Sequence, residues 1–544
     1  MHRERPVLWT EEQQAAIGAR GTDVLVSAAA GSGKTSVLVE RLIRRILDEE
    51  NPSSIDRLLV VTFTESAAAE MKERIRAALV KAVREGGSRR AVQQLAILGR
   101  AQISTLHGFC LKLLRRHFHV IGLDPSFRVL DEEEARLIFA GALDALFEAA
   151  HGGESGEGAE GLAALLLHYG GSRDDRDLRQ IVGELYEYVA SLPDGEAWLK
   201  AAEAAWRRED GGAAFAAWKD VLLQAALAEV GEAREALSEA LAIASLGGGP
   251  AAFAPSFAAA ASDLDAAISA LESGAWNLAA AKLQGVRWPR LKSDKDADPL
   301  LAERARDLWD RAKKAVRSWT DGAFCRSEEE WAADADRLQP VVSALVALVL
   351  EFRRLYAEAK RRMGAVDFSD LERMALAVLE SDGGRVAREC REAFDEVMVD
   401  EYQDINPVQD RLLSLVSRDE KGRRNRFLVG DVKQSIYRFR LADPTIFQSK
   451  HARFADPADP ESRRIDLQAN FRSHPGIVNF VNYAFRQVMQ GRCGGIEYGP
   501  DAFLRARGGF SAGDESPRVE LHLIERLDQD DAAEPGLPAV EREA

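Results

Sequence analysis

The feature that most restricts the fold of this chain is a glycine-rich loop between a short apolar run and an amphipathic helical pattern. In the segment DVLVSAAAGSGKTSVLVERLI, this loop contains Gly31, Ser32, Gly33, Lys34 and Thr35. Glycines allow backbone N–H groups to turn inward around an anion, and the start of the following helix adds positive potential. The segment therefore predicts a strand, a phosphate-binding loop and a helix.

The loop departs from the general pattern G-x-x-x-x-G-K-[ST], because Ala28 occupies the position of the first glycine. The apolar run before it and the GKT after it still favour a phosphate loop over an ordinary glycine-rich turn. We expect Lys34 to neutralise β and γ phosphate oxygens and the Thr35 hydroxyl to ligate Mg²⁺. The residues predicted to contact the nucleotide here are Ala28, Ala29, Ala30, Gly31, Ser32, Gly33, Lys34, Thr35 and Ser36.

Short apolar runs alternate with helical patterns on both sides of a long helical stretch. The runs DVLVSA, DRLLVVTF and AQISTL lie between residues 23 and 120, and FDEVMVDEY, RFLVGDV and RRIDLQANF follow residue 365. This alternation predicts an α/β fold with a parallel sheet and helices on both faces. Residues 121–365 are rich in Ala, Leu and Glu with glycine-rich breaks, which predicts a large helical insert.

Two acids follow the apolar run Val397 to Val399 in EVMVDEYQD. Open parallel sheets bind ligands at the carboxyl ends of their strands, so Asp400 and Glu401 are candidates for catalysis. We predict that Asp400 holds Mg²⁺ and that Glu401 orients and deprotonates the water that attacks the γ-phosphorus. A strand that ends in two acids is also compatible with a surface turn, so the surrounding motifs decide between the two.

The order of these motifs resembles that of the UvrD-like superfamily 1 DNA helicases. AxxGSGKT, VVTFTESAAAEMKERI, ISTLHGFCLKLLRRH, DEYQD, VGDVKQSIYRFR and LQANFRSHP follow one another along the chain. The segments RPVLWTEEQQAAI, SAAAGSGKT and AVDFSDLERMAL are most similar to AddA subunits of bacterial helicase-nucleases. The resemblance covers residues 1–130 and 365–485. It implies a RecA-like motor that uses ATP and Mg²⁺ to move 3′ to 5′ along DNA.

The resemblance also assigns roles to residues of this chain. Gln13 would read the adenine edge, Gln434 would sense the γ-phosphate, and Arg472 would reach it from a second motor domain. With Lys34, Asp400 and Glu401, Gln434 and Arg472 complete the predicted catalytic set. Contacts with single-stranded DNA are implied, by hydroxyls on phosphates or by aromatic stacking, for Thr62, Phe63, Thr64, Thr105, His107, Tyr437 and Phe439. His107 has no metal-ligand partner at suitable spacing, which excludes a metal role.

Four segments follow from this comparison. Residues 1–120 would be the first part of motor domain 1A, 121–365 a 1B-like insert, 366–460 the rest of 1A, and 461–544 the start of a 2A-like domain with a linker. Motifs V and VI and a nuclease domain are not found, and RVELHLIE and PAVEREA resemble the point where longer proteins enter another inserted domain. We therefore expect a truncated sequence that binds ATP weakly and does not unwind DNA alone.

Two functions remain open from the sequence. The first is an ATP-dependent 3′ to 5′ DNA helicase or translocase, which works with an AddB-like partner on single strands and duplex ends during double-strand break repair. The second is an ATP-gated module that binds single-stranded DNA without unwinding it. DNA-stimulated ATPase activity separates the two. A third, a non-helicase P-loop enzyme such as a kinase, would have to explain the order of the motifs.

The net charge of −16 is unusual for a protein that binds nucleic acid. Basic residues do concentrate in KERIRAALVKAVREGGSRR (72–90) and KLLRRHFH (112–119), although both are equally compatible with solvated helix faces. The cysteines lie far apart and form no CxxC pair, which fits a reducing cytoplasm; they are Cys110, Cys325, Cys390 and Cys493. Since no apolar stretch reaches about 18 residues, we expect a cytosolic protein without a membrane span.

Overall fold

The computed structural model describes residues 9–151, 165–166, 175–206, 212–491, 496–508 and 522. Apart from residue 522, the segments RVELHLIE and PAVEREA lie outside the described residues. Contacts divide the chain into two units. The first comprises Met1–Ser27 and Thr35–Ile465, and the second comprises Ala28–Lys34 and Asp466–Ala544.

A six-stranded sheet with the order β3-β2-β6-β7-β1-β8 organises the α/β part of the fold. Its strands are β1 (Asp23–Ala28), β2 (Leu58–Thr62), β3 (Gln102–Thr105), β6 (Glu396–Val399), β7 (Arg426–Gly430) and β8 (Ser462–Leu467). Neighbours from β3 to β1 pair in parallel, with Val60 opposite Met398 and Val24 opposite Phe427. Every residue of β2, β6 and β7 is buried, as expected for strands covered on both faces. The predicted α/β class with a parallel sheet is confirmed.

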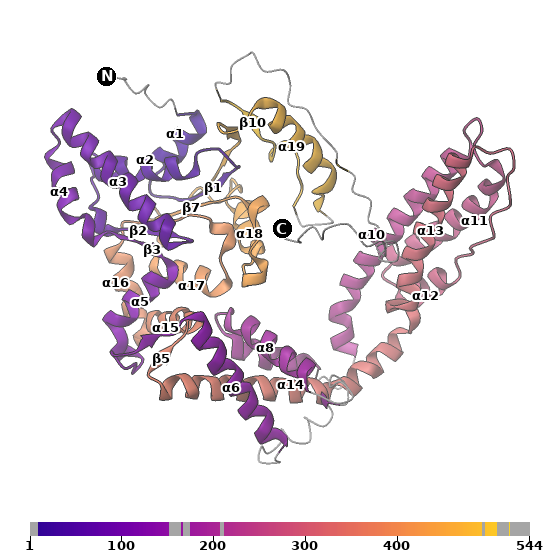
Figure 1. Cartoon of the computed structure of the whole chain (residues 1–544), viewed down its shortest axis with the longest axis horizontal. Helices are drawn as coiled ribbons and strands as arrows, with labels where there is room; N and C mark the ends of the chain where they lie inside the picture. The colour runs from indigo at the N-terminus through magenta and orange to yellow at the C-terminus, as the bar shows by residue number, and fades with distance from the viewer. Residues whose placement is uncertain are drawn as a thin grey trace, which may run out of the picture. The chain divides into compact units, whose positions relative to one another are not determined.

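Strand β6 lies between β2 and β7 although the long helical stretch separates it from β2 along the chain. One hydrophobic core joins the two halves, and it contains Leu59, Phe109, Leu371, Val397 and Leu428. The helices of this part, shown in Figure 1, are α1 (Glu11–Gly18), α2 (Lys34–Ile46), α3 (Glu65–Gly86), α4 (Arg89–Ile97), α5 (Leu106–His117), α15 (Phe368–Glu380), α16 (Arg385–Ala393), α17 (Pro407–Val416) and α18 (Pro444–Arg453).

The segment expected as a helical insert is helical over most of its described part. Its helices are α6 (Glu132–His151), α8 (Arg176–Ala190), α9 (Gly195–Trp206), α10 (Gly212–Ala244), α11 (Ala254–Glu272), α12 (Trp276–Gln284), α13 (Pro299–Asp321) and α14 (Glu328–Arg362). Helices α10 to α13 share a core around Phe257, Trp276 and Trp309, whereas α6, α8, α9 and α14 enclose Phe147 and Phe352. Figure 1 labels α10 to α13 in one group and α6, α8 and α14 in another. None of the helices in the described residues is long and apolar enough to cross a bilayer.

Two short strands mark where this segment leaves and rejoins the α/β part. Strand β4 (Arg128–Val129) pairs in parallel with β5 (Ala365–Val366). Backbone hydrogen bonds from Arg128 N to Gly364 O at 3.0 Å and from Leu130 N to Val366 O at 2.9 Å extend the pairing. The structure thus agrees with the expected position of the helical segment, while the four domain boundaries stay a prediction.

The described part of the second unit is small. It contains the loop Ala28–Lys34, β9 (Ala469–Asn470), α19 (Pro475–Val488) and β10 (Arg505–Ala506). Strands β9 and β10 pair in parallel, and Arg505 N donates to Gln468 O at 2.8 Å. The chain from residue 466 therefore contributes strand and helix next to the predicted phosphate loop within this unit.

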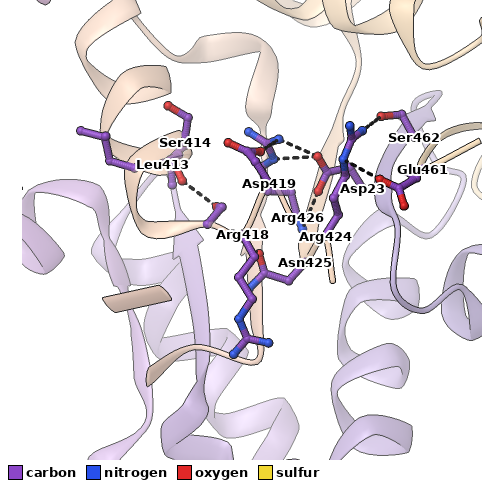
Figure 2. Close-up of polar contacts among 12 residues, drawn as sticks. Asp23, Leu413, Ser414, Arg418, Asp419, Arg424, Asn425, Arg426, Glu461 and Ser462 are labelled. Atoms are coloured by element: carbon purple, nitrogen blue, oxygen red, sulfur yellow. Dashed lines mark hydrogen bonds and ion pairs between the residues drawn. The ribbon is translucent and has the colours of Figure 1, made fainter. Parts of the chain in front are cut away.

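Buried charges fix the amino ends of β1 and β7. Asp23 is fully buried, and its carboxylate accepts from Arg426 Nε at 2.9 Å and from Arg426 N at 3.0 Å (Figure 2). Asp419 contacts the same guanidinium. Burial opposes the charged guanidinium, but Asp23 raises the pKa of Arg426 above its ordinary value. The start of β7 is thus tied to the start of β1 by a desolvated ion pair as well as by sheet hydrogen bonds.

We predict that Arg426→Met lowers the free energy of unfolding by about 3–5 kcal/mol, because the substitution leaves the buried Asp23 carboxylate without its main partner. The double variant Asp23→Leu, Arg426→Met should recover much of this loss, since neither charge then remains buried. Urea denaturation followed by circular dichroism measures both effects. A single variant as stable as the wild type would contradict the proposed importance of this pair.

Candidate functional site

The predicted phosphate loop connects β1, which ends at Ala28, to α2, which begins at Lys34. Gly31 and Gly33 have φ angles of +71° and +82°, in the region that favours glycine. A Cβ at Gly31 would lie 2.9 Å from Asn470 Nδ2, so this glycine is also required by a close approach within the second unit. Thr35 and Ser36 follow in the first turn of α2. The loop thus has the local geometry of an anion nest at a helix N-terminus.

The segment that carries Arg472 is hydrogen-bonded to this loop. Phe471 N donates to Gly31 O at 3.0 Å, and Asn470 Nδ2 donates to Ala30 O at 2.8 Å. The other end of the buried Asn470 amide accepts from Arg472 N at 3.0 Å. Arg472 itself is exposed. Asn470, which the motif roles did not include, therefore supports the backbone of both.

Asp400 and Glu401 lie directly after β6, as expected. Because β1, β6 and β7 are parallel, the residues that follow these strands leave the sheet at one edge. Asp400 N donates to Val61 O at 2.9 Å, which continues the pairing with β2. Glu401 has a φ of +51°, a left-handed conformation that costs a non-glycine residue about 1–3 kcal/mol. Such strain is common at functional sites, so it is consistent with the prediction that Glu401 is a functional residue.

Gln434 ends the short 3-10 helix Val432–Gln434 that follows β7. Its Nε2 donates to Asp431 Oδ2 at 2.7 Å, and Lys433 Nζ pairs with Asp431 Oδ1 at 2.7 Å. The buried Asp431 in turn donates its backbone N–H to Gln403 Oε1 at 2.9 Å. Gln403 and Asp431 were not assigned a role from the sequence, although both stand inside the motifs DEYQD and VGDVKQ.

Gln13 belongs to a capping box at the start of α1. Its side-chain oxygen accepts from Thr10 N at 3.0 Å, and the Thr10 hydroxyl accepts from Gln13 N at 3.2 Å. The residue is buried, with 5% of its surface exposed. The amide oxygen thus already stabilises the helix start, and the adenine contact stays a prediction.

The aromatic residues predicted to stack on DNA form one group of rings at the surface, in which Phe63 and Phe439 are exposed and Tyr437 is half-buried. Phe63 follows the end of β2, is 38% exposed, and has its ring centroid 4.8 Å from that of Tyr437. The Tyr437 ring lies 5.8 Å from that of Phe439, which is 76% exposed. The Arg440 guanidinium lies over both of the latter rings. Phe63 is therefore not a buried strand residue, and we call these four residues the aromatic cluster.

The threonines predicted to contact phosphates have structural partners. Thr62 is buried and its hydroxyl donates to Thr64 O at 3.1 Å. Thr64 caps α3 by accepting from Ala67 N at 3.1 Å. Thr105 caps α5 and its hydroxyl also donates to Glu65 Oε1 at 2.6 Å. These hydroxyls shape the starts of α3 and α5, and their contacts with DNA stay a prediction.

His107 pairs with a residue that the motif roles did not include. Its Nε2 lies 3.0 Å from Oε1 of the buried Glu372, and its ring lies 5.3 Å from that of Phe368. Glu372 also accepts from Gln409 Nε2 at 2.6 Å and Asn406 Nδ2 at 3.2 Å, near the start of α17. Burial disfavours the charged imidazole, but the hydrogen bond and charge of Glu372 raise the pKa of His107. Glu372 lies within AVDFSDLERMAL, the segment whose similarity to AddA subunits was the only sequence feature that pointed to this region.

A cavity of about 670 Å³ joins these features within the first unit. His107, Phe368 and Glu372 line it from the α/β part, and Phe439 and Arg440 extend it toward the aromatic cluster. Side chains of α6, α8 and α14 close the opposite wall; they include Phe139, Tyr186 and Tyr356. The lining of the cavity thus combines aromatic faces with polar and charged groups.

The residues predicted to hold nucleotide-bound Mg²⁺ are Thr35, in the first turn of α2, and Asp400, directly after β6. In the described residues, no group of three or more His, Cys, Asp or Glu side chains is placed to hold a metal ion. Mg²⁺ usually keeps waters and takes one or two protein ligands together with substrate phosphates. The predicted pair Thr35 and Asp400 agrees with that coordination chemistry.

Comparison with known proteins gives a consistent result. The model of the UvrD/REP helicase N-terminal domain matches residues 9–240 and 258–455. The chain is 46% identical over 539 residues to an ATP-dependent helicase/nuclease subunit of Pelotomaculum thermopropionicum, covering 95% of this chain and 42% of that protein. The corresponding protein of Bacillus licheniformis is 40% identical over 547 residues, with 98% and 44% covered. The chain thus spans less than half of the length of these relatives.

We predict that the pair of His107 and Glu372 stabilises the fold more at low pH. Because the folded-state pKa of His107 is raised, this contribution is complete below the usual histidine pKa of about 6.5 and is lost as the pH rises through the higher folded-state value. The difference in thermal midpoint between wild type and His107→Gln should therefore be larger at pH 6 than at pH 9. The exposed His119, changed to Gln, is the control. A difference independent of pH would argue against the charged pair.

Proposed function

Because this chain belongs to the UvrD/REP helicase family, we propose that it is the ATP-binding portion of a 3′ to 5′ DNA helicase or translocase. In this proposal it works with an AddB-like partner on single strands and duplex ends in double-strand break repair, in the bacterial cytoplasm. The observation that carries the proposal is the phosphate loop, with Gly31 and Gly33 in left-handed conformations and the Arg472 segment hydrogen-bonded to it.

The proposed roles on the nucleotide side follow the chemistry of each group. Lys34 and the loop N–H groups bind phosphates, and Gln13 contacts the adenine. Thr35 and Asp400 hold Mg²⁺, which when bound neutralises charge on the phosphates. Glu401 orients and deprotonates the attacking water, while Gln434 and Arg472 respond to the γ-phosphate.

The proposed DNA site combines the aromatic cluster with the adjoining cavity. Exposed rings stack on any base, which suits a motor that moves along DNA without reading its sequence. Phe368 and His107 continue the same lining into the cavity. Thr62, Thr64 and Thr105 support this surface from the starts of α3 and α5.

We propose that residues 1–120 and 366–460 form motor domain 1A, 121–365 domain 1B, and 461–544 the start of domain 2A.

A second candidate function is an ATP-gated module that binds single-stranded DNA without unwinding it. The exposed rings of Phe63 and Phe439, which can stack on the bases of an already separated strand, favour this candidate. DNA-stimulated ATP hydrolysis, together with an unwinding assay on a duplex with a single-stranded end, distinguishes the two.

We predict that Glu401→Gln reduces ATP hydrolysis by about 10²–10⁴-fold and leaves the affinity for a fluorescent ATP analogue nearly unchanged, because a general base is lost but the phosphate loop is not. Lys34→Ala should instead abolish binding of the analogue. ATPase rates with and without single-stranded DNA provide the measurement, and Glu392→Gln on the exposed face of α16 is the control. Equal ATPase rates for wild type and Glu401→Gln would sink the catalytic assignment.

We predict that Phe439→Ala weakens binding of single-stranded DNA by about 1–3 kcal/mol, the value of one base stacked on an aromatic ring. Fluorescence anisotropy with labelled oligonucleotides measures the change. The exposed Trp218 of α10, changed to Ala, is the matched aromatic control. An equal loss of affinity in both variants would show that Phe439 has no special place in the DNA site.

A further inference from the structure

We propose that Gln403 is a positioning residue that holds the carboxylate of Glu401 and links it to the loop containing Gln434. This inference rests on the proposed function and adds a residue that none of the predicted roles includes. The side chain of Gln403 is only 2% exposed, so the amide has no access to bulk water and its hydrogen bonds within the protein determine its position.

The contacts of Gln403 reach the chain segments that follow two neighbouring strands. Its Nε2 donates to Glu401 Oε2 and to Asp404 Oδ2, each at 2.9 Å. Its Oε1 accepts from Asp431 N at 2.9 Å, and its backbone oxygen accepts from Ser435 Oγ at 3.3 Å. One amide therefore connects the residues after β6 with the residues after β7.

A glutamine is the appropriate residue type here. Its N–H₂ group faces two carboxylates, while its oxygen faces a backbone N–H. A carboxylate has no donor and would repel Glu401 and Asp404, and an apolar side chain would leave Asp431 N without an acceptor. Only an amide satisfies all three partners with one side chain.

Gly430 provides the space for this amide. A Cβ added at Gly430 would lie 2.5 Å from Gln403 Oε1 and 3.0 Å from Cε2 of Phe447. Phe447 is fully buried, so the ring has little freedom to move away. The end of β7 thus contacts Gln403 directly, and a displacement of this strand end has to move the amide.

The link has a direct consequence for Glu401. The backbone of this residue is strained, with a φ of +51°, and its carboxylate accepts from Gln403 Nε2 at 2.9 Å. Asp431 binds Gln434 through its carboxylate and Gln403 through its backbone N–H. A change in the contacts of Gln434 is therefore transmitted through Asp431 and Gln403 to Glu401.

Two substitutions in the full chain distinguish the role of the N–H₂ group of Gln403 from the role of its amide oxygen. Gln403→Met removes every side-chain hydrogen bond, whereas Gln403→Glu keeps an acceptor for Asp431 N but repels Glu401. Both should lower the kcat of DNA-stimulated ATP hydrolysis by about 10–100-fold, the usual effect of losing a group that orients a catalytic ligand, with KM for ATP nearly unchanged. Hydrogen exchange at Asp431 N should accelerate in Gln403→Met and stay slow in Gln403→Glu.

The control is Gln180→Met, because the exposed Gln180 also donates to a glutamate, Glu184 Oε1, at 2.7 Å. This variant should leave kcat and exchange at Asp431 N unchanged. Gly430→Ala supplies an independent test, since it retains Gln403 but crowds it, and we expect a similar loss of kcat.

A merely structural role predicts other results. Faster exchange throughout β6 and β7 in Gln403→Glu, or a loss of activity explained by a higher KM for ATP, would overturn the proposal. Unchanged kcat and unchanged exchange at Asp431 N in Gln403→Met would also overturn it. A wild-type chain that hydrolyses no ATP, with or without DNA, contradicts the proposed function instead. In that case the exchange measurements still decide whether Gln403 links the two loops.

Discussion

The parallel pairing of β6 between β2 and β7 is the constraint on which the rest of this structure depends. Asp400 and Glu401 follow β6, whereas the loop of Gln434 follows β7. Without the pairing of these strands, the two acids would have no fixed position relative to that loop. The pairing is non-local, so it has to be supported by burial and by charges as well as by backbone hydrogen bonds. The buried residues of the strands supply the burial. Part of the charge interaction comes from Arg41, which pairs with Glu396 at the start of β6.

The two ends of the sheet consequently have different chemistry. At the amino ends, the ion pairs of Asp23 with Arg426 and of Arg41 with Glu396 are desolvated, which suits positions that have to stay in place. At the carboxyl ends, the carboxylates of Glu401 and Asp404 share one amide, and the backbone of Glu401 is strained. The strained backbone and the shared hydrogen bonds of this part of the fold therefore lie at the carboxyl end of the sheet.

The sequence predicted the features that depend on local pattern. The glycines of the phosphate loop, the acids after Val399 and the alternation of strands and helices all follow from periodicity and residue type. It did not predict Gln403, Glu372 or Asn470, because each acquires its role from partners distant in the chain, such as His107 for Glu372 and Ala30 for Asn470. The capping box of Thr10 and Gln13 follows from the local pattern TEEQ, whereas the adenine role of Gln13 is implied only by the family resemblance.

The pairing of β4 with β5 has a further consequence for how such a chain can change. The two ends of the long helical segment are hydrogen-bonded neighbours, so the chain enters and leaves the segment at one place. A further contact lies outside this place, because Val408 N of α17 donates to Ser191 O at 3.3 Å. Next to the paired strands, the buried Lys360 is held between Asp367 and Asp370. Lengthening, shortening or exchanging the helices between these strands would leave the spacing of the pair unaltered. Such a change would instead be felt where the segment lines the cavity, at Phe139, Tyr186 and Tyr356.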